Sequence, residues 1–165
     1  MAKINNVLAP VIDEQTKVLI VGSMPGKISL EKQQYYGNER NHFWGIMSHI
    51  LQQDVPSTYD KKIAWLLDNQ IGLWDAIASC ERIGSLDSAI KQEVPNDFEQ
   101  LLVRYPNVER IVFNGGKAER VFLKYFKHTF SEQVSYMLMP STSPVPGKNV
   151  KSFEEKVICW QQIIQ

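Results

Sequence analysis

A short apolar run that leads directly into a turn of glycine and proline limits most strongly how this chain can fold. Residues Lys17–Gly22 read KVLIVG, and the turn that follows reads SMPG and ends at Gly26. An apolar run without polar alternation is typical of a strand covered on both faces, as in a parallel sheet between helices. Ligands of such sheets bind outside the carboxyl ends of the strands. The sequence therefore predicts a parallel sheet with a binding site near residues 22–26.

Three further segments predict strands of the same sheet. They are Val108–Phe113, Val134–Met139 and Ile71–Ala78, and for the last of these a helix is the alternative. Apolar residues recur at helical spacing within residues 43–51, 63–67, 98–102, 118–125 and 153–164. Strands that alternate with helices predict an α/β fold, a three-layer α/β/α sandwich around a central four-stranded, mostly parallel sheet. We expect residues 1–165 to form one domain.

Charge and cysteine content exclude some classes of protein. Lys and Arg number 18, as do Asp and Glu, so the net charge gives no nucleic-acid signal, although a local basic patch can still bind DNA. Cys80 and Cys159 are far apart, and the three histidines have no ligand spacing. We therefore expect no metal, no cofactor and no disulfide framework. No apolar run approaches the roughly 20 residues that span a membrane, and the N-terminus lacks the apolar core of a signal peptide. These features favour a cytoplasmic protein.

Three turns that follow predicted strands are candidate binding elements. Gly22 and Gly26 permit close backbone approach, so N–H groups of the turn can face a ligand, although a plain strand-to-helix loop is the alternative. The turn is neither GxGxxG nor a phosphate loop. Gly115 opens a predicted helix whose N-terminal N–H groups, with Lys117, are suited to a DNA phosphate, and a structural turn is the alternative.

The third turn, MPSTSPVPGKN, combines stiffness with hydroxyl groups. Pro140, Pro144 and Pro146 exclude helix and central strand, and an ordinary surface loop is the alternative interpretation. The hydroxyls suit phosphate oxygens and belong to Ser141, Thr142 and Ser143.

Two adjacent tyrosines and one asparagine complete the candidate set. We expect one of Tyr35 and Tyr36 to pack inward and the other to offer its ring to a planar ligand, because stacking on a base is worth about 1–3 kcal/mol. Asn41 precedes a predicted helix and can also be its cap. No Ser/His/Asp arrangement or carboxylate pair stands out, so an enzyme of this sequence works with neutral groups and backbone dipoles.

Five segments, in order, resemble the uracil-DNA glycosylase superfamily, and within it the hypoxanthine (deoxyinosine) DNA glycosylase family. The superfamily's first motif, a strand followed by Gly-x-Asp/Asn-Pro-Gly/Tyr, here reads GSMPG over residues 22–26. Its second motif, His/Asn-Pro-Ser with a short loop, here reads MPSTSP over residues 139–144. The segments YYGNERNHFW, GLWDAIASCERIGSLDSAI and FNGGKA are also similar to the family. The resemblance runs over nearly the whole chain and implies a uracil-DNA glycosylase-like fold.

Two departures from the superfamily pattern bear on the mechanism that the resemblance implies. Met24 stands where the superfamily commonly has the Asp or Asn that orients water, and Met139 replaces the residue that stabilises the leaving uracil. The hypoxanthine family is similar in lacking the first of these and uses the asparagine before x-Phe-Trp, which here is Asn41.

The resemblance implies a monofunctional DNA N-glycosylase that flips out a deaminated base, hypoxanthine above all, and leaves an abasic site. It implies a monomer that repairs DNA in a bacterial or archaeal cytoplasm. Asn41 is then catalytic and holds the attacking water, and Ser141, Thr142, Ser143, Gly115 and Lys117 contact DNA. The expected base-binding residues are Gly22, Ser23, Met24, Pro25, Gly26, Tyr36 and, on the pocket floor, Asp75.

Three alternatives stay open at this point. The enzyme can be a glycosylase for uracil or for G:U/T mismatches. The fold can also recognise a base without cleaving it. A third class, a nucleotide-binding protein that uses NGGKA, would need no DNA strand.

Overall fold

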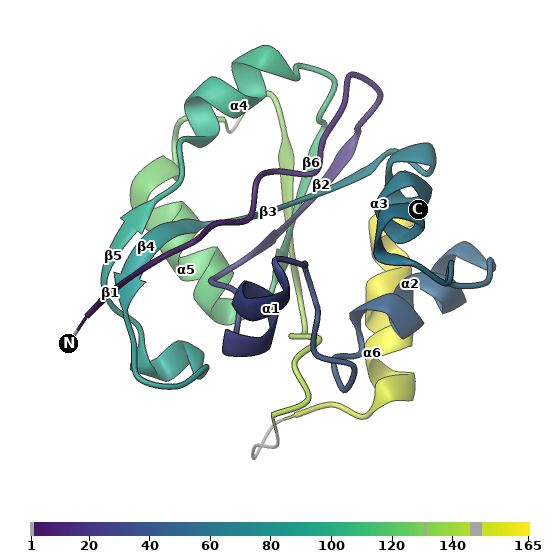
Figure 1. The fold of residues 1–165 in the computed structure, drawn as a ribbon. Coiled ribbons are helices and arrows are strands. Elements are labelled where there is room, and N and C mark those ends of the chain that lie inside the picture. The colour runs from purple at the N-terminus through teal and green to yellow at the C-terminus, as the bar shows by residue number, and fades with distance from the viewer. Residues whose placement is uncertain (1, 131, 146–149) are drawn as a thin grey trace.

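A parallel sheet lies at the centre of the molecule. The structure is a computed structural model that describes residues 2–130, 132–145 and 150–165. The sheet has the order β3-β2-β6-β7, and all three pairings are parallel (Figure 1). Its strands are β2 (Val18–Gly22), β3 (Ile71–Asp75), β6 (Arg110–Asn114) and β7 (Ser135–Met139). The four predicted strands are confirmed, and the segment that begins at Ile71 is a strand rather than a helix.

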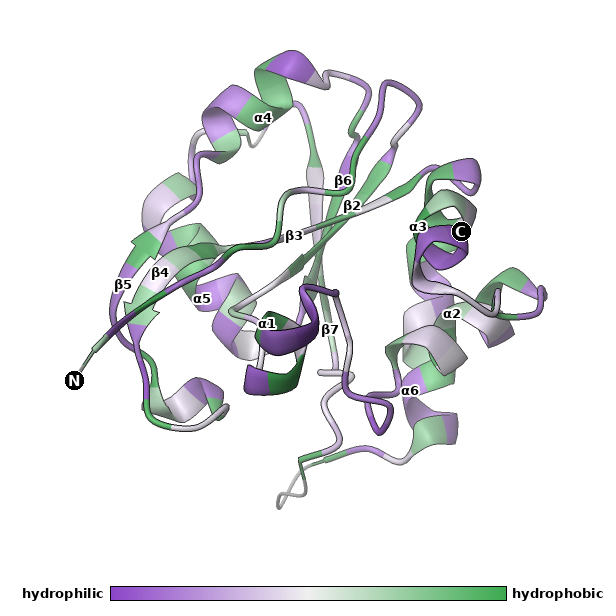
Figure 2. Ribbon diagram, in the orientation of Figure 1, coloured by the Kyte–Doolittle hydropathy of each residue, from purple (hydrophilic) through white to green (hydrophobic). Residues whose placement is uncertain are grey.

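Helices cover both faces of this sheet, which confirms the predicted three-layer arrangement (Figure 1). On one side lie α2 (Phe43–Leu51), α3 (Tyr59–Asp68) and α6 (Phe153–Trp160), and on the other lie α4 (Phe98–Arg104) and α5 (Gly116–Phe126). Figure 2 shows these helices as mixed hydrophobic and hydrophilic ribbons on either side of the strands.

Successive residues of β2 pack into two separate hydrophobic cores, one on each face of the sheet. Ile20 packs with Phe43 and Trp160 in the core beneath α2 and α6. Leu19 and Val21 point to the opposite face and pack in the core beneath α4 and α5. A strand that is buried on both faces needs an unbroken apolar run, which is the pattern of residues 17–22.

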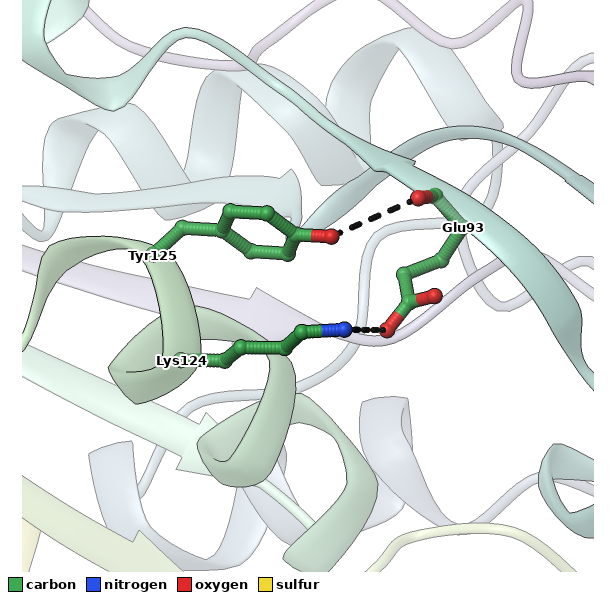
Figure 3. A network of polar contacts seen from close by, with 3 residues as sticks. All are labelled: Glu93, Lys124 and Tyr125. Atoms are coloured by element: carbon green, nitrogen blue, oxygen red, sulfur yellow. Dashed lines mark hydrogen bonds and ion pairs between the residues drawn. The ribbon is translucent and has the colours of Figure 1, made fainter.

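A second, antiparallel sheet was not predicted. It has the order β1-β4-β5 and contains β1 (Lys3–Asn5), β4 (Ile77–Glu81) and β5 (Lys91–Pro95). Only Ala76 separates β3 from β4, so the single strand predicted over residues 71–78 is in fact two strands of different sheets. Two side chains of α5 contact Glu93 of β5. Lys124 Nζ lies 3.1 Å from Glu93 Oε1, and the Tyr125 hydroxyl lies beside the Glu93 carbonyl (Figure 3).

The remaining elements are short. They are α1 (Lys27–Lys32) and two 3-10 turns, η1 (Asp87–Ala89) and η2 (Gln161–Ile164), the second of which continues α6. Asp97 is the N-cap of α4, and its carboxylate accepts the N–H of Gln100. In the part of the chain that the structure describes, no helix is both long and apolar enough to cross a membrane.

Candidate active site

A cavity of about 590 Å³ opens at the carboxyl edge of the parallel sheet. The last residues of three strands line it, namely Gly22 of β2, Asp75 of β3 and Asn114 of β6. The turn at residues 23–26, Tyr36, Asn41 and the loop at residues 141–145 complete its wall. The cavity therefore lies where a parallel sheet is expected to bind ligands.

Asp75 provides a buried carboxyl group at the edge of the cavity. Its exposed fraction is 5%, and its Oδ2 accepts a hydrogen bond of 3.0 Å from the side-chain amide of Asn6 in the N-terminal segment. A Cβ atom at Gly22 would lie 2.6 Å from Asp75 Oδ1, so only glycine at position 22 leaves room for this carboxyl group.

The environment of Asp75 changes its acidity. Burial raises the pKa of Asp75 to about 6, the Asn6 hydrogen bond opposes this rise, and the charge of Asp87 adds to it. A carboxyl group with this pKa exchanges its proton near neutral pH, so it can accept a hydrogen bond when ionised or donate one when protonated.

Tyr36 is a ring held in a fixed orientation. It stacks on Phe43 with ring centroids 4.0 Å apart and planes inclined by 13°, and its hydroxyl accepts a 3.1 Å hydrogen bond from the Asn114 amide. Its backbone lies in the left-handed region, with φ of 53°. Burial raises the pKa of the Tyr36 phenol above its ordinary value, which keeps it neutral. Tyr35 is buried in the core beneath α2 and α6 and donates its hydroxyl to the Ala9 carbonyl. Both tyrosines line the cavity, and Tyr36 is the less buried of the two.

Asn41 both caps a helix and lines the cavity. Its Oδ1 accepts the N–H of Phe43 at 2.9 Å, at the start of α2. A carbonyl oxygen has two lone pairs, so one remains available to a water molecule. The capping interpretation and the water-holding interpretation of Asn41 are thus compatible.

The turn after β2 is fixed through its carbonyl groups. The Gly22 and Ser23 carbonyls accept N–H groups from Ala76 and Ile77. Among the described residues, the N–H groups of Ser23 and Met24 have no acceptor, and both residues line the cavity. The predicted arrangement, in which turn N–H groups face a ligand, is therefore available in the structure. Pro25 and Gly26 line the cavity as well.

All three residues of the hydroxyl loop line the cavity. Thr142 is buried, and its Oγ1 and backbone N–H are both joined to the Asn114 side chain, at 3.0 Å each. These bonds attach the loop to the end of β6, and the predicted phosphate contact of Thr142 stays a prediction. Ser141 is exposed and Ser143 half-buried, and both line the cavity. Pro146 lies outside the described residues.

Of the NGGKA turn, Asn114 lines the cavity and residues 115–118 do not. Gly115 is buried, with φ of 95°, and its N–H donates to the Met139 carbonyl at 3.0 Å. The Gly115 N–H is therefore occupied within the protein, and the predicted DNA contact of Gly115 stays a prediction. Lys117 does not line the cavity, and its charge lies close enough to Glu93 to help lower the pKa of that carboxyl group. Met139 is likewise buried in a core and does not line the cavity.

Lys156 of α6 is a cavity residue that the sequence analysis missed. Its exposed fraction is 1%, and its ammonium group lies 3.1 Å from His42 Nδ1 and donates to the Ser143 carbonyl at 3.2 Å. An ammonium group only donates, so His42 Nδ1 is the acceptor. Burial lowers the pKa of Lys156, and no carboxylate of the described residues forms an ion pair with it. A lysine between Phe153 and Trp160 on the apolar face of a helix was the available signal.

In the described ranges, no three His, Cys, Asp or Glu side chains lie close enough together to hold a metal ion. The polar side chains that line the cavity supply two carboxyl groups, neutral amides, hydroxyls and three ammonium groups. Such a set suits the binding of a neutral, planar, hydrogen-bonding group beside an anion.

Comparison with known proteins gives consistent matches. The family described as the uracil DNA glycosylase superfamily matches residues 9–164. The hypoxanthine DNA glycosylase of Methanosarcina barkeri is 43% identical over 110 residues, which are 66% of this chain and 70% of that protein. The hypoxanthine DNA glycosylase of Methanosarcina acetivorans is 45% identical over 109 residues, or 66% of this chain and 69% of that protein. A solution NMR structure from Methanosarcina acetivorans, described as a candidate uracil DNA glycosylase, has a TM-score of 0.78 and 34% identity, and covers 96% of this chain and 97% of its own.

Proposed function

The chain belongs to the uracil DNA glycosylase superfamily, and we propose on this premise that it is a DNA glycosylase that removes hypoxanthine from deoxyinosine in DNA. The observation that carries the proposal is the cavity at the end of the sheet, which joins an anchored aromatic ring, a buried carboxyl group and a free amide. We further propose that residues 1–165 act as one domain and as a monomer.

The base binds between Tyr36 and Asp75. One face of the Tyr36 ring is covered by Phe43, which leaves the other for a flipped base, and base stacking on an aromatic ring is worth about 1–3 kcal/mol. Hypoxanthine presents a ring N–H beside a carbonyl oxygen. Ionised Asp75 accepts the N–H, and the free N–H groups of Ser23 and Met24 donate to carbonyl or ring-nitrogen acceptors.

Asn41 positions the attacking water. The water oxygen forms a bond to the sugar C1′ and gives up one proton while the bond from C1′ to the purine nitrogen breaks. The electron pair leaves with the purine, which takes up a proton, so that overall the water supplies OH to the sugar and H to the base. Through its free lone pair, Asn41 holds the water on the sugar. A neutral amide is a weak base, so its contribution is orientation rather than proton abstraction. The charge that develops on the purine is stabilised by donors that are already in place.

The DNA backbone lies against the opposite side of the cavity. The hydroxyls of Ser141 and Ser143 and the ammonium of Lys156 are the groups there that suit phosphate oxygens. The nucleotide is thereby oriented with its base toward Asp75 and its phosphates toward α6.

The proposal is tested by excision from matched labelled oligonucleotides that carry one deoxyinosine, one deoxyuridine or neither, followed by alkali to cut abasic sites. Faster cleavage at deoxyinosine is the expected result. Faster cleavage at deoxyuridine would instead favour the uracil or mismatch glycosylase, whose substrate presents the same N–H and carbonyl pattern in a smaller ring. DNA binding without any cleavage would replace the proposal by a base-binding module.

A further inference from the structure

The side-chain amide of Asn6 is held in one orientation by three hydrogen bonds. Its Nδ2 donates to Asp75 Oδ2 and to the Ile77 carbonyl, and its Oδ1 accepts the N–H of Leu8, at 3.0 Å each. If the amide were reversed, its oxygen would face two acceptors and its nitrogen would face a donor. The amide therefore presents an N–H group, and not its oxygen, to Asp75.

The antiparallel sheet holds Asp75 at two different points. Asn6 directly follows β1, and its own N–H donates to the Ala78 carbonyl of β4 at 2.8 Å. Asn96 directly follows β5, and its Nδ2 donates to the backbone carbonyl of Asp75 at 2.8 Å. One asparagine thus holds the carboxyl group of Asp75, and the other holds only its backbone.

The two oxygens of the Asp75 carboxyl group lie in different environments. Oδ2 is occupied by the Asn6 amide. Oδ1 lies on the side of Gly22, which lines the cavity as Asp75 does. Within the described ranges Oδ1 forms no hydrogen bond, yet it is not among the enclosed side-chain atoms that lack a partner, so it is reachable from the cavity. A proton that Asp75 takes up therefore goes to Oδ1, because Oδ2 already faces a donor.

The titratable groups around Asp75 do not stabilise its charge. The charge of Asp87 raises the pKa of Asp75, and the phenols of Tyr35 and Tyr36 stay neutral because burial raises the pKa of each. In the part of the chain that the structure describes, no cation forms an ion pair with Asp75. The hydrogen bond from Asn6 is the contact that lowers this pKa and so favours the ionised carboxylate.

On the basis of the function proposed above, we propose that Asn6 determines which purine the cavity accepts, by keeping Asp75 Oδ1 a hydrogen-bond acceptor. Hypoxanthine carries a hydrogen on its ring nitrogen N1, which matches an acceptor. Adenine has a lone pair on the same nitrogen, which an acceptor repels and which only a donor would match. Asp75 protonated on Oδ1 is such a donor. Asn6 thereby makes the cavity selective for the deaminated purine over its parent base, although it touches neither.

The first test is the pH dependence of deoxyinosine excision by the wild type, Asn6→Leu, Asn6→Ser and Asn96→Ala. Leu fills the space of Asn without a donor, and Ser keeps an oxygen for the Leu8 N–H but is too short to hold Asp75. The wild-type rate is expected to rise with pH through about 6, as Asp75 ionises. Both Asn6 variants are expected to move this midpoint to higher pH, because they lose the contact that favours the ionised form.

The size of the effect depends on pH in a way that a merely structural role does not reproduce. Below the midpoints, each unit of displacement lowers the excision rate about tenfold, whereas well above them the rates converge. Asn96→Ala is the matched control, because it removes an amide that holds Asp75 only through the backbone. Its midpoint is expected to stay at the wild-type value, whatever its rate.

A second test reads base selectivity without turnover. Non-cleavable 2′-fluoro analogues of deoxyinosine and deoxyadenosine are placed in single strands, so that base pairing does not contribute, and binding at pH 7 is measured by fluorescence anisotropy. The wild type and Asn96→Ala are expected to prefer the inosine analogue about tenfold or more. Asn6→Leu and Asn6→Ser are expected to lose most of this preference.

Other outcomes overturn the role of Asn6. Lower rates with an unchanged midpoint would mean that Asn6 only supports the fold, and a shift in Asn6→Leu but not in Asn6→Ser would assign the effect to the Leu8 turn. An equal shift in Asn96→Ala would make it a general loosening around Asp75. Absence of excision by the wild type at every pH would refute the proposed function separately. The binding test still decides on Asn6 in that case, since equal preferences in all four proteins would refute its role.

Discussion

At the scale of single residues, the raised pKa of Asp75 links the stability of the protein to pH. Burial lifts this pKa from 3.8 to about 6, so between these values the folded state binds more protons than the unfolded state. The free energy of unfolding therefore falls as pH rises through this window, by up to about 3 kcal/mol from this one group.

Asp75→Asn removes the ionisation and keeps an oxygen for the Asn6 amide. Urea unfolding at pH 4, 5, 6 and 7 is expected to show a smaller decline in stability for the variant than for the wild type, so that the variant is the more stable at pH 7. Parallel pH profiles for the two proteins would contradict the raised pKa.

Asn41 has two roles that two substitutions separate. Asn41→Ala removes the amide and the helix cap, which costs about 1 kcal/mol of stability, whereas Asn41→Ser keeps an oxygen to cap α2. Both variants are expected to lose excision by about 100-fold or more, because neither holds the water as the amide does. DNA binding, measured by fluorescence anisotropy, stays close to wild type. Wild-type turnover by Asn41→Ser would show that Asn41 is only a cap.

The sequence predicted which residue types gather at the site better than it predicted where each points. Tyr36 and Asn41 lie between a predicted strand and a predicted helix, so their place near the carboxyl edge could be inferred. Asp75 lay inside the strand predicted over residues 71–78, and its place at the site came from the family resemblance. Thr142 could not be told from Ser141 and Ser143, because which hydroxyl turns inward depends on Asn114, 28 residues earlier in the chain. The Gly115 N–H, which the sequence left free, has its acceptor in β7, a partner that lies 24 residues later in the chain.

At the scale of elements, α6 joins the two halves of the cavity. Trp160 Nε1 donates to the Pro140 carbonyl at 2.9 Å, and Lys156 donates to the Ser143 carbonyl one helical turn away. Lys156 also contacts His42, the residue that follows Asn41. One helix thereby holds both the loop proposed to bind phosphate and the turn that carries the water-positioning residue.

Lys156→Met tests the charge on this helix. The apolar side chain fills similar space and removes a buried ammonium, so the free energy of unfolding is expected to stay equal or rise. DNA affinity is expected to fall, and the slope of log affinity against log salt to decrease by about one, as for one lost phosphate contact. Lys117→Met is the control, since Lys117 lies outside the cavity. If both variants have the same salt slope, Lys156 does not contact a DNA phosphate.

Elements with long apolar runs were predictable, and short polar ones were not. β2, β3 and β6 are mostly buried and show in their own sequences, whereas β7 is largely exposed or half-buried but still carries the apolar run YMLM. β1 and β5 have mostly exposed or half-buried residues, KIN and KQEVP, and exist because they pair with the two sides of β4. Such strands are specified by partners about 75 or about 15 residues away rather than by local pattern.

At the scale of the whole molecule, a zero net charge leaves DNA binding to a few local cations. Lys27, Lys151 and Lys156 are the lysines that line the cavity among the described residues. Three phosphate contacts predict a log–log salt slope of about −3 for duplex DNA. Anisotropy titrations over a range of salt concentrations measure this slope. A slope steeper than about −6 would reveal a second cationic surface away from the cavity.

The residues that form the cavity come from distant parts of the sequence, and this has a consequence for biosynthesis. Asn6, which holds Asp75, lies near one end of the sequence, and Lys156, which holds the loop, lies near the other. On the ribosome, β2 meets β3 early, yet its other neighbour, β6, emerges some 90 residues later, and α6 follows last. A nascent chain therefore carries an unpaired edge of β2 until β6 emerges, and its cavity lacks Lys156 until α6 has been made. A chain interrupted before β6 has neither the central pairing of the sheet nor the Asn114 side chain that anchors the loop of Thr142.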